Sequence, residues 1–391
     1  MYLVFPSFNL YSMPLLILVL QGYLFALLLL RRYFVKKNIS DLFLSLLLII
    51  TGYHTTTYTI GFMGWYDTYR NTKINYWLVD FIFAVGPLVY FYVKSLTEPQ
   101  FKFRKIDFWH FVPAIVFWIY KMSFFYYDSL QPGFSDVQNG WFVTNIHYQY
   151  VSPWLGPLKD MSYLGYLLVS FKVYLDHRNN IQQYFSNTYK VELNWLRNFI
   201  VLFIVLFLLQ TILYFTDFSF FENYWKQRWW GDFAKVLTLV YVGMMGYFSD
   251  FTKLRILQKI PETVVQPRVN LVSNETSELD KHKKQVTDYM TTHQPFLNPE
   301  ITLPELAKNM KMSTNQLSQV INTGFDKNFN EFINSYRVEI FKSKLRDESL
   351  QHLSLLGIAL ECGFNSKATF NRVFKKITNQ SPSQYQKSLK G

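Results

Sequence analysis

The sequence predicts an all-α protein: an N-terminal polytopic membrane helix bundle with seven spans, followed by a C-terminal all-α domain with two helix-turn-helix units. Half of the 391 residues are hydrophobic and 19% are aromatic, which suits lipid-facing and interfacial surfaces. Long apolar stretches fill residues 1–250, and a 3.6-residue periodicity replaces them near Leu279. We therefore predict a membrane domain (1–250), a cytoplasmic linker (251–279) and a C-terminal helical domain (280–391).

Seven stretches in the membrane domain are long enough to cross a bilayer, which needs about 20 mainly apolar residues. They cover residues 13–30, 41–63, 76–96, 107–126, 155–175, 196–216 and 232–250. The second is the least apolar because it contains the run GYHTTTYTIG (52–61), and the fifth has Lys159 and Asp160 near its start. No small-residue cleavage site follows the first stretch, so we interpret it as a membrane helix and not as a signal peptide.

The distribution of Lys and Arg between the loops predicts the orientation, because cytoplasmic loops carry the excess of positive charge. Fifteen Lys and Arg residues lie in or beside the loops after spans one, three, five and seven, and 4 lie in the alternate loops. We therefore expect the N-terminus to lie outside and the C-terminal domain to lie in the cytoplasm. This assigns the chain to the bacterial inner (cytoplasmic) membrane as a multi-pass protein.

Several polar residues fall near the outward ends of the expected spans, where charges are costly and often functional. One interpretation is that they reach to the membrane surface or pair with one another at the rim. The other is a polar pocket that is open to the outside and takes an unknown ligand. The candidate ligand-binding residues are His54, Asp80, Lys121 and Asp160. No metal-ligand spacing and no catalytic triad occur in the sequence, so we expect neither a cofactor nor an enzyme.

The predicted linker contains Pro261 and Pro267, which oppose an uninterrupted helix. The single cysteine, Cys362, excludes an intrachain disulfide and lies on an expected buried helix face. We predict that it is a core thiol.

The first helix-turn-helix unit is predicted around the stretch LPELAKNMKMSTNQLSQVIN (303–322). Thr302 and Glu305 have the spacing of a capping box, and the apolar residues of 303–310 recur at i, i+3, i+4 and i+7. After a short turn, Ser313 is expected to cap a second helix whose outward face is polar. Two short helices around a turn are typical of this motif.

The same pattern recurs about 52 residues later. Leu355, Ile358, Ala359 and Cys362 repeat the apolar face, Gly363 makes the turn, and Ser366 caps the next helix. The inward face of that helix is expected to hold Phe370, Val373, Phe374 and Ile377. Residues 328–345 are predicted to form one spacer helix between the two units. The domain carries 16 Lys and Arg against 10 Asp and Glu, which favours an acidic partner.

Residues 280–391 resemble the DNA-binding domain of AraC-family transcription regulators, through LPELAKNMKMSTNQLSQVIN, FINSYRVE and GFNSKATFNRVFKKITNQSPSQY. The membrane half resembles membrane-bound members only in its architecture. The resemblance implies that the second helix of each unit enters the major groove of double-stranded DNA. Its DNA-binding residues then are Asn315, Ser318, Gln319, Asn322, Lys367, Ala368, Thr369, Arg372, Lys375 and Lys376. Asp326 stands where the family usually has glycine, and Gln386 where it usually has arginine.

Together these features predict a membrane-embedded one-component transcription regulator. Its transmembrane half senses an unknown small-molecule or lipid-phase signal, and a homodimer in the bilayer raises the effective concentration on DNA. The alternative is a transporter or membrane enzyme with a fused regulatory DNA-binding domain. A third interpretation treats the spans as a passive anchor.

Overall fold

A computed structural model describes residues 4–69, 78–98, 100–188, 193–216, 224–248, 276–350 and 352–390. Every element in these ranges is a helix, apart from one isolated antiparallel bridge between Phe185 and Thr302. The prediction of an all-α protein is therefore confirmed for the described part of the chain. The chain divides into two compact units, of which the first comprises residues 1–174 and 194–251 and the second residues 175–193 and 252–391.

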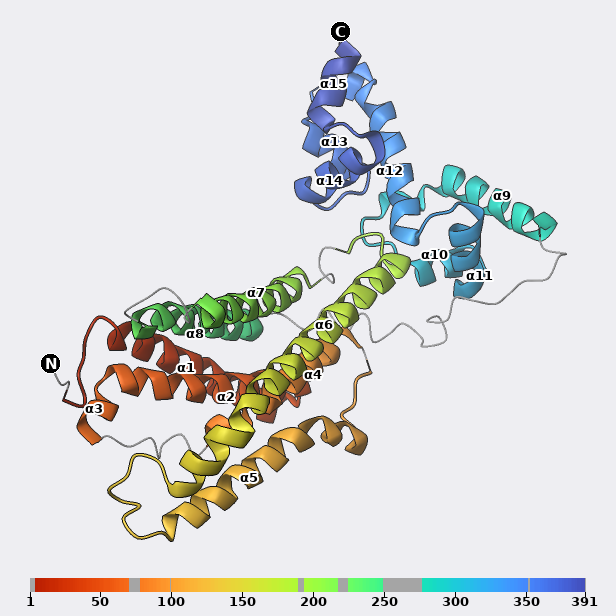
Figure 1. Ribbon diagram of the computed structural model, residues 1–391. Coiled ribbons are helices and arrows are strands. Elements are labelled where there is room, and N and C mark those ends of the chain that lie inside the picture. The colour runs from red at the N-terminus through yellow and green to blue at the C-terminus, as the bar shows by residue number, and fades with distance from the viewer. Residues whose placement is uncertain are drawn as a thin grey trace. The chain divides into compact units, whose positions relative to one another are not determined.

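The first unit contains a helix at each position where the sequence predicts a span (Figure 1). The other elements among the described residues of this unit are the short α3 (Trp65–Tyr69) and the π-helix η4 (Val143–Val151). The helices at the expected spans are α1 (Ser12–Lys36), α2 (Ile39–Phe62), η2 with α4 (Leu78–Ala84, Val85–Thr97), η3 with α5 (Lys105–Phe111, Val112–Ser129), α6 (Ser152–Tyr184), α7 (Asn194–Thr216) and α8 (Tyr224–Phe248).

Four helical segments in the described part of the chain are long and apolar enough to cross a membrane: Ser12–Lys36, Ile39–Phe62, Lys105–Ser129 and Asn194–Ile212. The expectation of seven spans is therefore supported for four stretches only. The third stretch forms a shorter apolar helix, Phe81–Thr97. The fifth and seventh form long helices, α6 and α8, that carry several charged residues. These charges lower the apolar content below that of a simple span.

The polar run in α2 is compatible with a membrane helix because its hydroxyls are satisfied within the helix. Thr55 Oγ1 donates to the carbonyl of Thr51 at 3.0 Å, and Thr56 Oγ1 donates to Gly52 at 2.9 Å. Thr59 Oγ1 donates to the carbonyl of Thr55 at 3.0 Å. Because each hydroxyl group has a hydrogen-bond acceptor within the helix, its burial does not carry the free-energy cost of an unsatisfied polar group.

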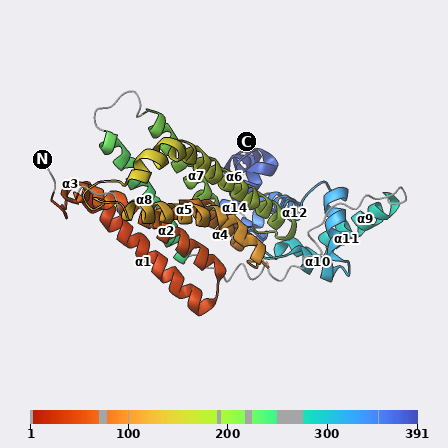
Figure 2. The same ribbon diagram turned by 60° about the horizontal axis from the view of Figure 1, so that its bottom comes forward.

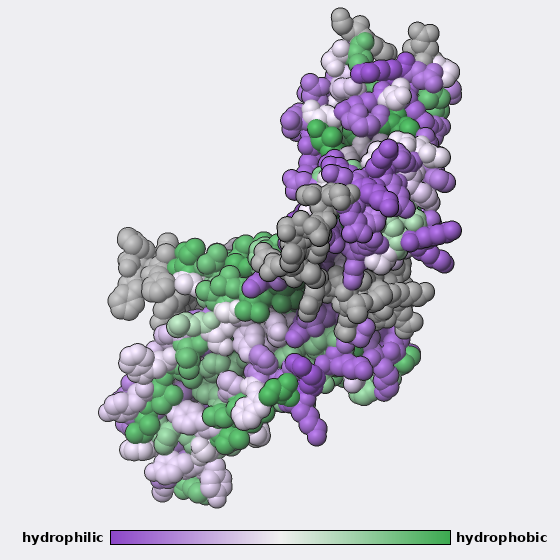
Figure 3. Space-filling model, turned by 90° about the vertical axis from the view of Figure 1, so that its right-hand side faces the viewer, coloured by the Kyte–Doolittle hydropathy of each residue, from purple (hydrophilic) through white to green (hydrophobic). Residues whose placement is uncertain are grey.

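Helix α2 lies centrally in the first unit and packs against α1, α4 and α8, while α8 also packs against α1 and α7 (Figure 2). Glycines allow close approach between these helices. A β-carbon at Gly22 of α1 would lie 2.8 Å from Leu239 of α8, and one at Gly243 would lie 2.8 Å from Phe25. On the face drawn in Figure 3, hydrophobic residues form patches over this unit, and hydrophilic residues predominate over the second unit.

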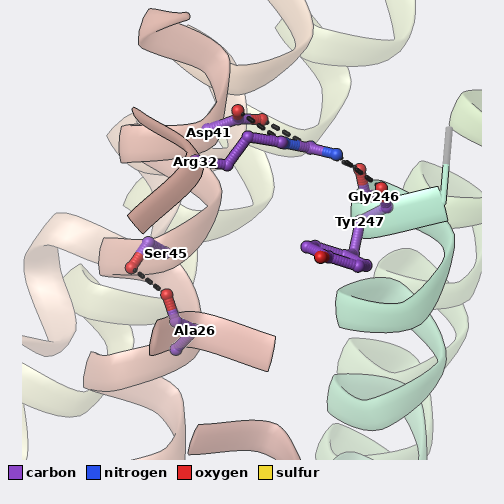
Figure 4. Close-up of polar contacts among 6 residues, drawn as sticks. All are labelled: Ala26, Arg32, Asp41, Ser45, Gly246 and Tyr247. Carbon is purple, nitrogen blue, oxygen red and sulfur yellow. Dashed lines mark hydrogen bonds and ion pairs between the residues drawn. The ribbon is translucent and has the colours of Figure 1, made fainter. Parts of the chain in front are cut away.

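Arg32 joins α1, α2 and α8 at the end of the first unit that is predicted to be cytoplasmic (Figure 4). Arg32 at the end of α1 pairs with the nearly buried Asp41 at the start of α2, 2.7 Å away. Arg32 also donates to the carbonyls of Gly246 and Tyr247 in the last turns of α8. These carbonyls have few partners within their own helix, so the guanidinium stabilises the end of α8.

The second unit contains the end of α6 and the C-terminal helices. They are α9 (Thr276–His293), η7 (Pro295–Leu297), α10 (Leu303–Asn309), α11 (Thr314–Gln319), η8 (Val320–Gly324), α12 (Phe329–Leu345), η9 (Glu348–Leu350), α13 (Leu355–Glu361), α14 (Lys367–Thr378) and α15 (Pro382–Lys390). The predicted linker falls mostly outside the described residues, and its last four positions belong to α9.

The expected N-caps are present in this unit, although of the capping box predicted at Thr302 and Glu305 only the hydrogen bond to the Thr302 side chain forms. Thr302 accepts a hydrogen bond from the amide of Glu305 at 3.4 Å, Ser313 accepts one from Gln316 at 3.1 Å, and Ser366 accepts one from Thr369 at 3.2 Å. A full capping box occurs at α12, where the side chains of Asn328 and Glu331 each bind the other's backbone amide. The spacer helix therefore begins and ends where the sequence predicts.

Two hydrophobic cores lie on the two sides of α12. The first contains the predicted inward residues Leu303, Leu306, Leu317 and Ile321, and the second contains Ile358, Phe370 and Phe374, among others. Cys362 is fully buried in the second core, where burial raises the pKa of its thiol to about 11. The expectation for Ile377 is wrong, because it is 39% exposed in the last turn of α14.

Candidate nucleic-acid interface

Helix α11 presents the polar face of the first helix-turn-helix unit. Its N-terminus follows a turn in which Lys311 adopts a left-handed φ of 57°. Asn315 and Gln319 are exposed, whereas Ser318 and Asn322 are partly exposed. The side-chain amide of Asn322 donates a hydrogen bond to Ser318 Oγ at 3.3 Å, and this bond orients both side chains. The two exposed amides are the groups best placed to read an adenine edge.

Helix α14 presents the corresponding face of the second unit. Lys367, Ala368, Arg372 and Lys375 are exposed on it. Thr369 is only partly exposed, and its hydroxyl lies 3.1 Å from Ser366 Oγ in the cap of the helix. The guanidinium of Arg372 is therefore the strongest candidate on α14 for a bidentate contact with guanine.

Lys376 occupies a different setting from its neighbour Lys375. Its ammonium lies 2.6 Å from Glu331 Oε1 at the start of α12, and both side chains are exposed to solvent. The hydrogen bond from Lys376 is the main cause that lowers the pKa of Glu331. The sequence assigns Lys376 to a DNA phosphate, but in this structure Glu331 competes for the same ammonium.

Asp326 takes the backbone conformation that glycine favours. Its φ is 51°, in the turn between η8 and α12. The departure from the family pattern therefore leaves the left-handed turn in place, at a cost of about 1 kcal/mol for a residue with a β-carbon.

A buried arginine that the sequence reasoning missed joins the two helix-turn-helix units. Arg337 of α12 is 2% exposed. Its Nε donates to the carbonyl of Phe296 at 2.7 Å and its Nη2 to the carbonyl of Asn298 at 2.9 Å. Burial lowers the pKa of Arg337 to about 10. An arginine at an inward position of the amphipathic spacer helix is the signal that could have identified it.

The turn of the second helix-turn-helix unit lies against the segment that precedes the first helix-turn-helix unit. Gly363 has a φ of 89°, and a β-carbon there would lie 2.4 Å from the carbonyl oxygen of Phe296. Beside it, the amide of Asn365 donates to Glu300 Oε1 at 2.9 Å. Arg337, Gly363 and Asn365 thus join the two helix-turn-helix units into one frame. We call α11 and α14, the helices expected to contact DNA, the recognition helices of this frame.

The four candidate ligand residues lie on different elements of the first unit. The ring of His54 on α2 lies 5.4 Å from that of Tyr58. The ammonium of Lys121 on α5 lies 5.3 Å from the centre of the Phe124 ring. Asp160 on α6 is exposed and pairs with Lys159 at 3.4 Å. Asp80 lies in η2, and its side chain is outside the described part of the structure.

The loop after α5 folds onto the end of that helix. Asp128 is buried and accepts hydrogen bonds from the amides of Phe142 and Val143, at 2.8 and 3.4 Å. The ring of Phe142 stacks on Phe124, 5.7 Å away. Burial, with a smaller effect of Lys121, lowers the pKa of His147 to about 4, so this histidine is neutral near pH 7. Asp128 is a further position that the sequence reasoning did not find.

Comparisons with known proteins agree with this geometry. Residues 306–388 match the family model of a helix-turn-helix domain. The chain is 34% identical over 115 residues to uncharacterized HTH-type transcriptional regulators of Staphylococcus aureus strains COL and MSSA476. The match covers 29% of this chain and only 14% of the length of each relative. No solved structure matches the chain.

The C-terminal part of the chain is therefore a helix-turn-helix domain. It is of the AraC type, with two units on one spacer helix, as its sequence motifs predict.

Proposed function

We propose that the protein is a membrane-embedded one-component transcription regulator. The observation that carries this proposal is the frame of two helix-turn-helix units with exposed polar faces on α11 and α14. The same chain contains four helical segments that are long and apolar enough to cross a membrane. A signal received by the first unit then changes how the second unit occupies DNA.

In this proposal, α11 and α14 read successive major grooves, about 34 Å apart along the duplex. Asn315 and Gln319 recognise adenine, Arg372 recognises guanine, and Lys375 holds a phosphate. Lys367, Ala368, Thr369, Ser318 and Asn322 complete the surface. A homodimer through the membrane half raises the effective concentration of this surface on a repeated site.

The residues of the first unit support a sensing role less directly. His54, Asp80, Lys121 and Asp160 remain our candidates for the ligand site, in a domain of residues 1–250 with its N-terminus outside. The transporter or membrane-enzyme alternative is not favoured, because the matched relatives are regulators and the matched domain is a DNA-binding type.

Genome-wide mapping of bound DNA in cells that produce the full chain tests this function. Arg372→Ala is expected to lose sites that contain a specific guanine, because each good bidentate pair contributes about 1–3 kcal/mol of discrimination. Arg346→Ala is the matched control, since it removes the same charge at an exposed position outside the recognition helices. The assignment of Arg372 fails if both variants keep all wild-type sites.

A further inference from the structure

The stretch between the fifth and sixth expected spans is part of the core of the second unit. We call residues 175–188 the docking segment; it comprises the last turns of α6 and the chain that follows. By the positive charge of its loop, this stretch is predicted to be cytoplasmic. It lies far from the C-terminal domain in sequence, yet it folds with that domain.

The apolar part of the docking segment fills the first helix-turn-helix core. Ile181 is 2% exposed, Tyr184 9% and Phe185 8%. They belong to the same cluster as Ile301, Leu303 and the inward residues of α10, α11 and α12. A buried aromatic side chain contributes strongly to such a core. The docking segment is therefore a component of this core and not a surface loop that merely touches it.

The polar part of the docking segment is also satisfied by the C-terminal domain. The backbone amide and the hydroxyl of Ser186 both donate to the carbonyl of Ile301, at 3.3 and 2.8 Å. The side-chain amide of Asn330 donates to the carbonyl of Ser186 at 2.7 Å and to that of Phe185 at 3.2 Å. Arg337 Nη2 donates to Ser186 Oγ at 3.3 Å. The receiving surface thus recognises both the backbone and the side chains of this segment.

Two residues of the C-terminal domain that contact the docking segment lie at the ends of helices that build the first helix-turn-helix unit. Phe185 forms the isolated bridge with Thr302, the N-cap of α10, and Asn330 lies in the first turn of α12. Arg337, which also contacts the docking segment, is the residue that joins the two helix-turn-helix units. A displacement of the docking segment therefore acts on the orientation of α10 and on the frame between the recognition helices.

We propose that the docking segment couples the membrane half to the DNA-binding domain. Helix α6 continues from the first unit into this segment, so a rotation or shift of α6 is carried into the first helix-turn-helix core. The coupling role rests on the proposed function as a regulator; the docking itself does not. This gives the chain a direct intramolecular route for the signal besides the linker of residues 251–279.

Cleavage of the linker in membrane vesicles tests the docking. A site for a specific protease is inserted between Pro267 and Arg268 of the full chain, and the membranes are sedimented after cleavage. We expect the C-terminal fragment to stay with the membranes. Phe185→Ala should weaken its retention about 100-fold, since it deletes a buried aromatic ring. The released fragment keeps its wild-type sequence in this variant, so its own folding is not altered.

A second variant approaches the same contact from the other side. Asn330→Ala removes two hydrogen bonds to the docking segment and should weaken retention about 10-fold. Ser335→Ala on the same helix is the matched control, because its hydroxyl donates only within α12, to Phe332, at 2.7 Å. Equal release from the wild type, Phe185→Ala and Asn330→Ala overturns the docking.

Alanine insertions between Leu175 and Asp176 test the coupling. Each inserted residue turns the docking segment by about 100° relative to the preceding part of α6, and four residues return it to within about 40°. A reporter placed under a mapped site should change several-fold with one, two or three insertions and recover with four. Constant output at all lengths, with retention intact, overturns the coupling. A wild type without any DNA occupancy overturns the proposed function instead, and the cleavage assay still measures docking.

Discussion

The carbonyl oxygen of Phe296 lies 2.4 Å from the place that a β-carbon on Gly363 would occupy. Gly363 also has a φ of 89°, which only glycine adopts at little cost. This one contact joins the turn of the second helix-turn-helix unit to the segment that precedes the first, so the relative position of the two recognition helices depends on the absence of a side chain.

Gly363→Ala is expected to destabilise the C-terminal domain by about 2 kcal/mol or more, from backbone strain and overpacking together. Hydrogen exchange of α12 peptides in the detergent-solubilised full chain measures this loss. Gly357→Ala is the control, since its nearest neighbour lies 3.5 Å away and alanine favours the helix. Equal protection in both variants contradicts the bracing contact.

Arg337→Met should destabilise the same domain by about 3 kcal/mol, because the buried carbonyl of Phe296 and the partly buried carbonyl of Asn298 lose their donor. The exposed Arg346→Ala should change the stability by less than about 0.5 kcal/mol. Denaturant unfolding, followed by proteolysis within the domain, provides the measurement. A small effect at Arg337 shows that water replaces the guanidinium.

The ion pair between Glu331 and Lys376 predicts an acid-sensitive contribution to stability. The pKa of Glu331 is lowered from 4.5 in the folded protein, mainly by the hydrogen bond from Lys376. The contribution is therefore fully present above about pH 4.5 and is lost as the pH falls through the lower, folded value. Glu331→Gln should flatten the pH dependence of unfolding in this window. Glu339→Gln on the same helix should leave it unchanged.

The same ion pair predicts unequal roles for the two lysines of α14 on DNA. Lys375→Gln should reduce the slope of log affinity against log salt by about 0.9, the value for one phosphate contact. Lys376→Gln should reduce it less, because Glu331 holds its ammonium in the free protein. In a Glu331→Gln background the two lysines should become equivalent. Fluorescence anisotropy with the full chain in nanodiscs compares the slopes of each parent protein and of its two lysine variants, with and without Glu331→Gln.

Thiol labelling tests the orientation of the membrane half. Cys362 is fully buried, so the wild-type chain should give little background with a membrane-impermeant maleimide. In intact cells, Asp136→Cys in the exposed loop after α5 should be labelled, and Lys308→Cys on α10 should react only after lysis. The reverse pattern contradicts the assignment of the N-terminus to the outside.

Periodicity and capping rules predicted the local structure of the C-terminal domain well. The buried faces of α10 and α14, the caps at Ser313 and Ser366 and the spacer helix all follow from residue types at fixed spacing. The role of Arg337 did not follow, because its partners are backbone carbonyls whose positions no side-chain pattern reveals. The same limit applies to Asp128, which accepts hydrogen bonds from backbone amides at the start of the next helix, 14 and 15 positions away.

The membrane half shows a different limit. Each apolar stretch corresponds to a helix, but in the described part of the chain length and composition support four spans. The third stretch forms a shorter apolar helix, and α6 and α8 carry several charged residues. The position of Phe185 in the core of the C-terminal domain could not be predicted from the sequence either. A single aromatic residue after a helix has no periodic signature, and its partners lie more than a hundred positions away.

The bridge between Phe185 and Thr302 has a consequence for the order of synthesis. The ribosome completes residues 175–188 well before Ile301, Leu303 and Ile333 emerge. The core that these later residues form also contains Ile181, Tyr184 and Phe185. A C-terminal fragment that begins after residue 188 lacks these three side chains and therefore leaves an apolar face of this core uncovered.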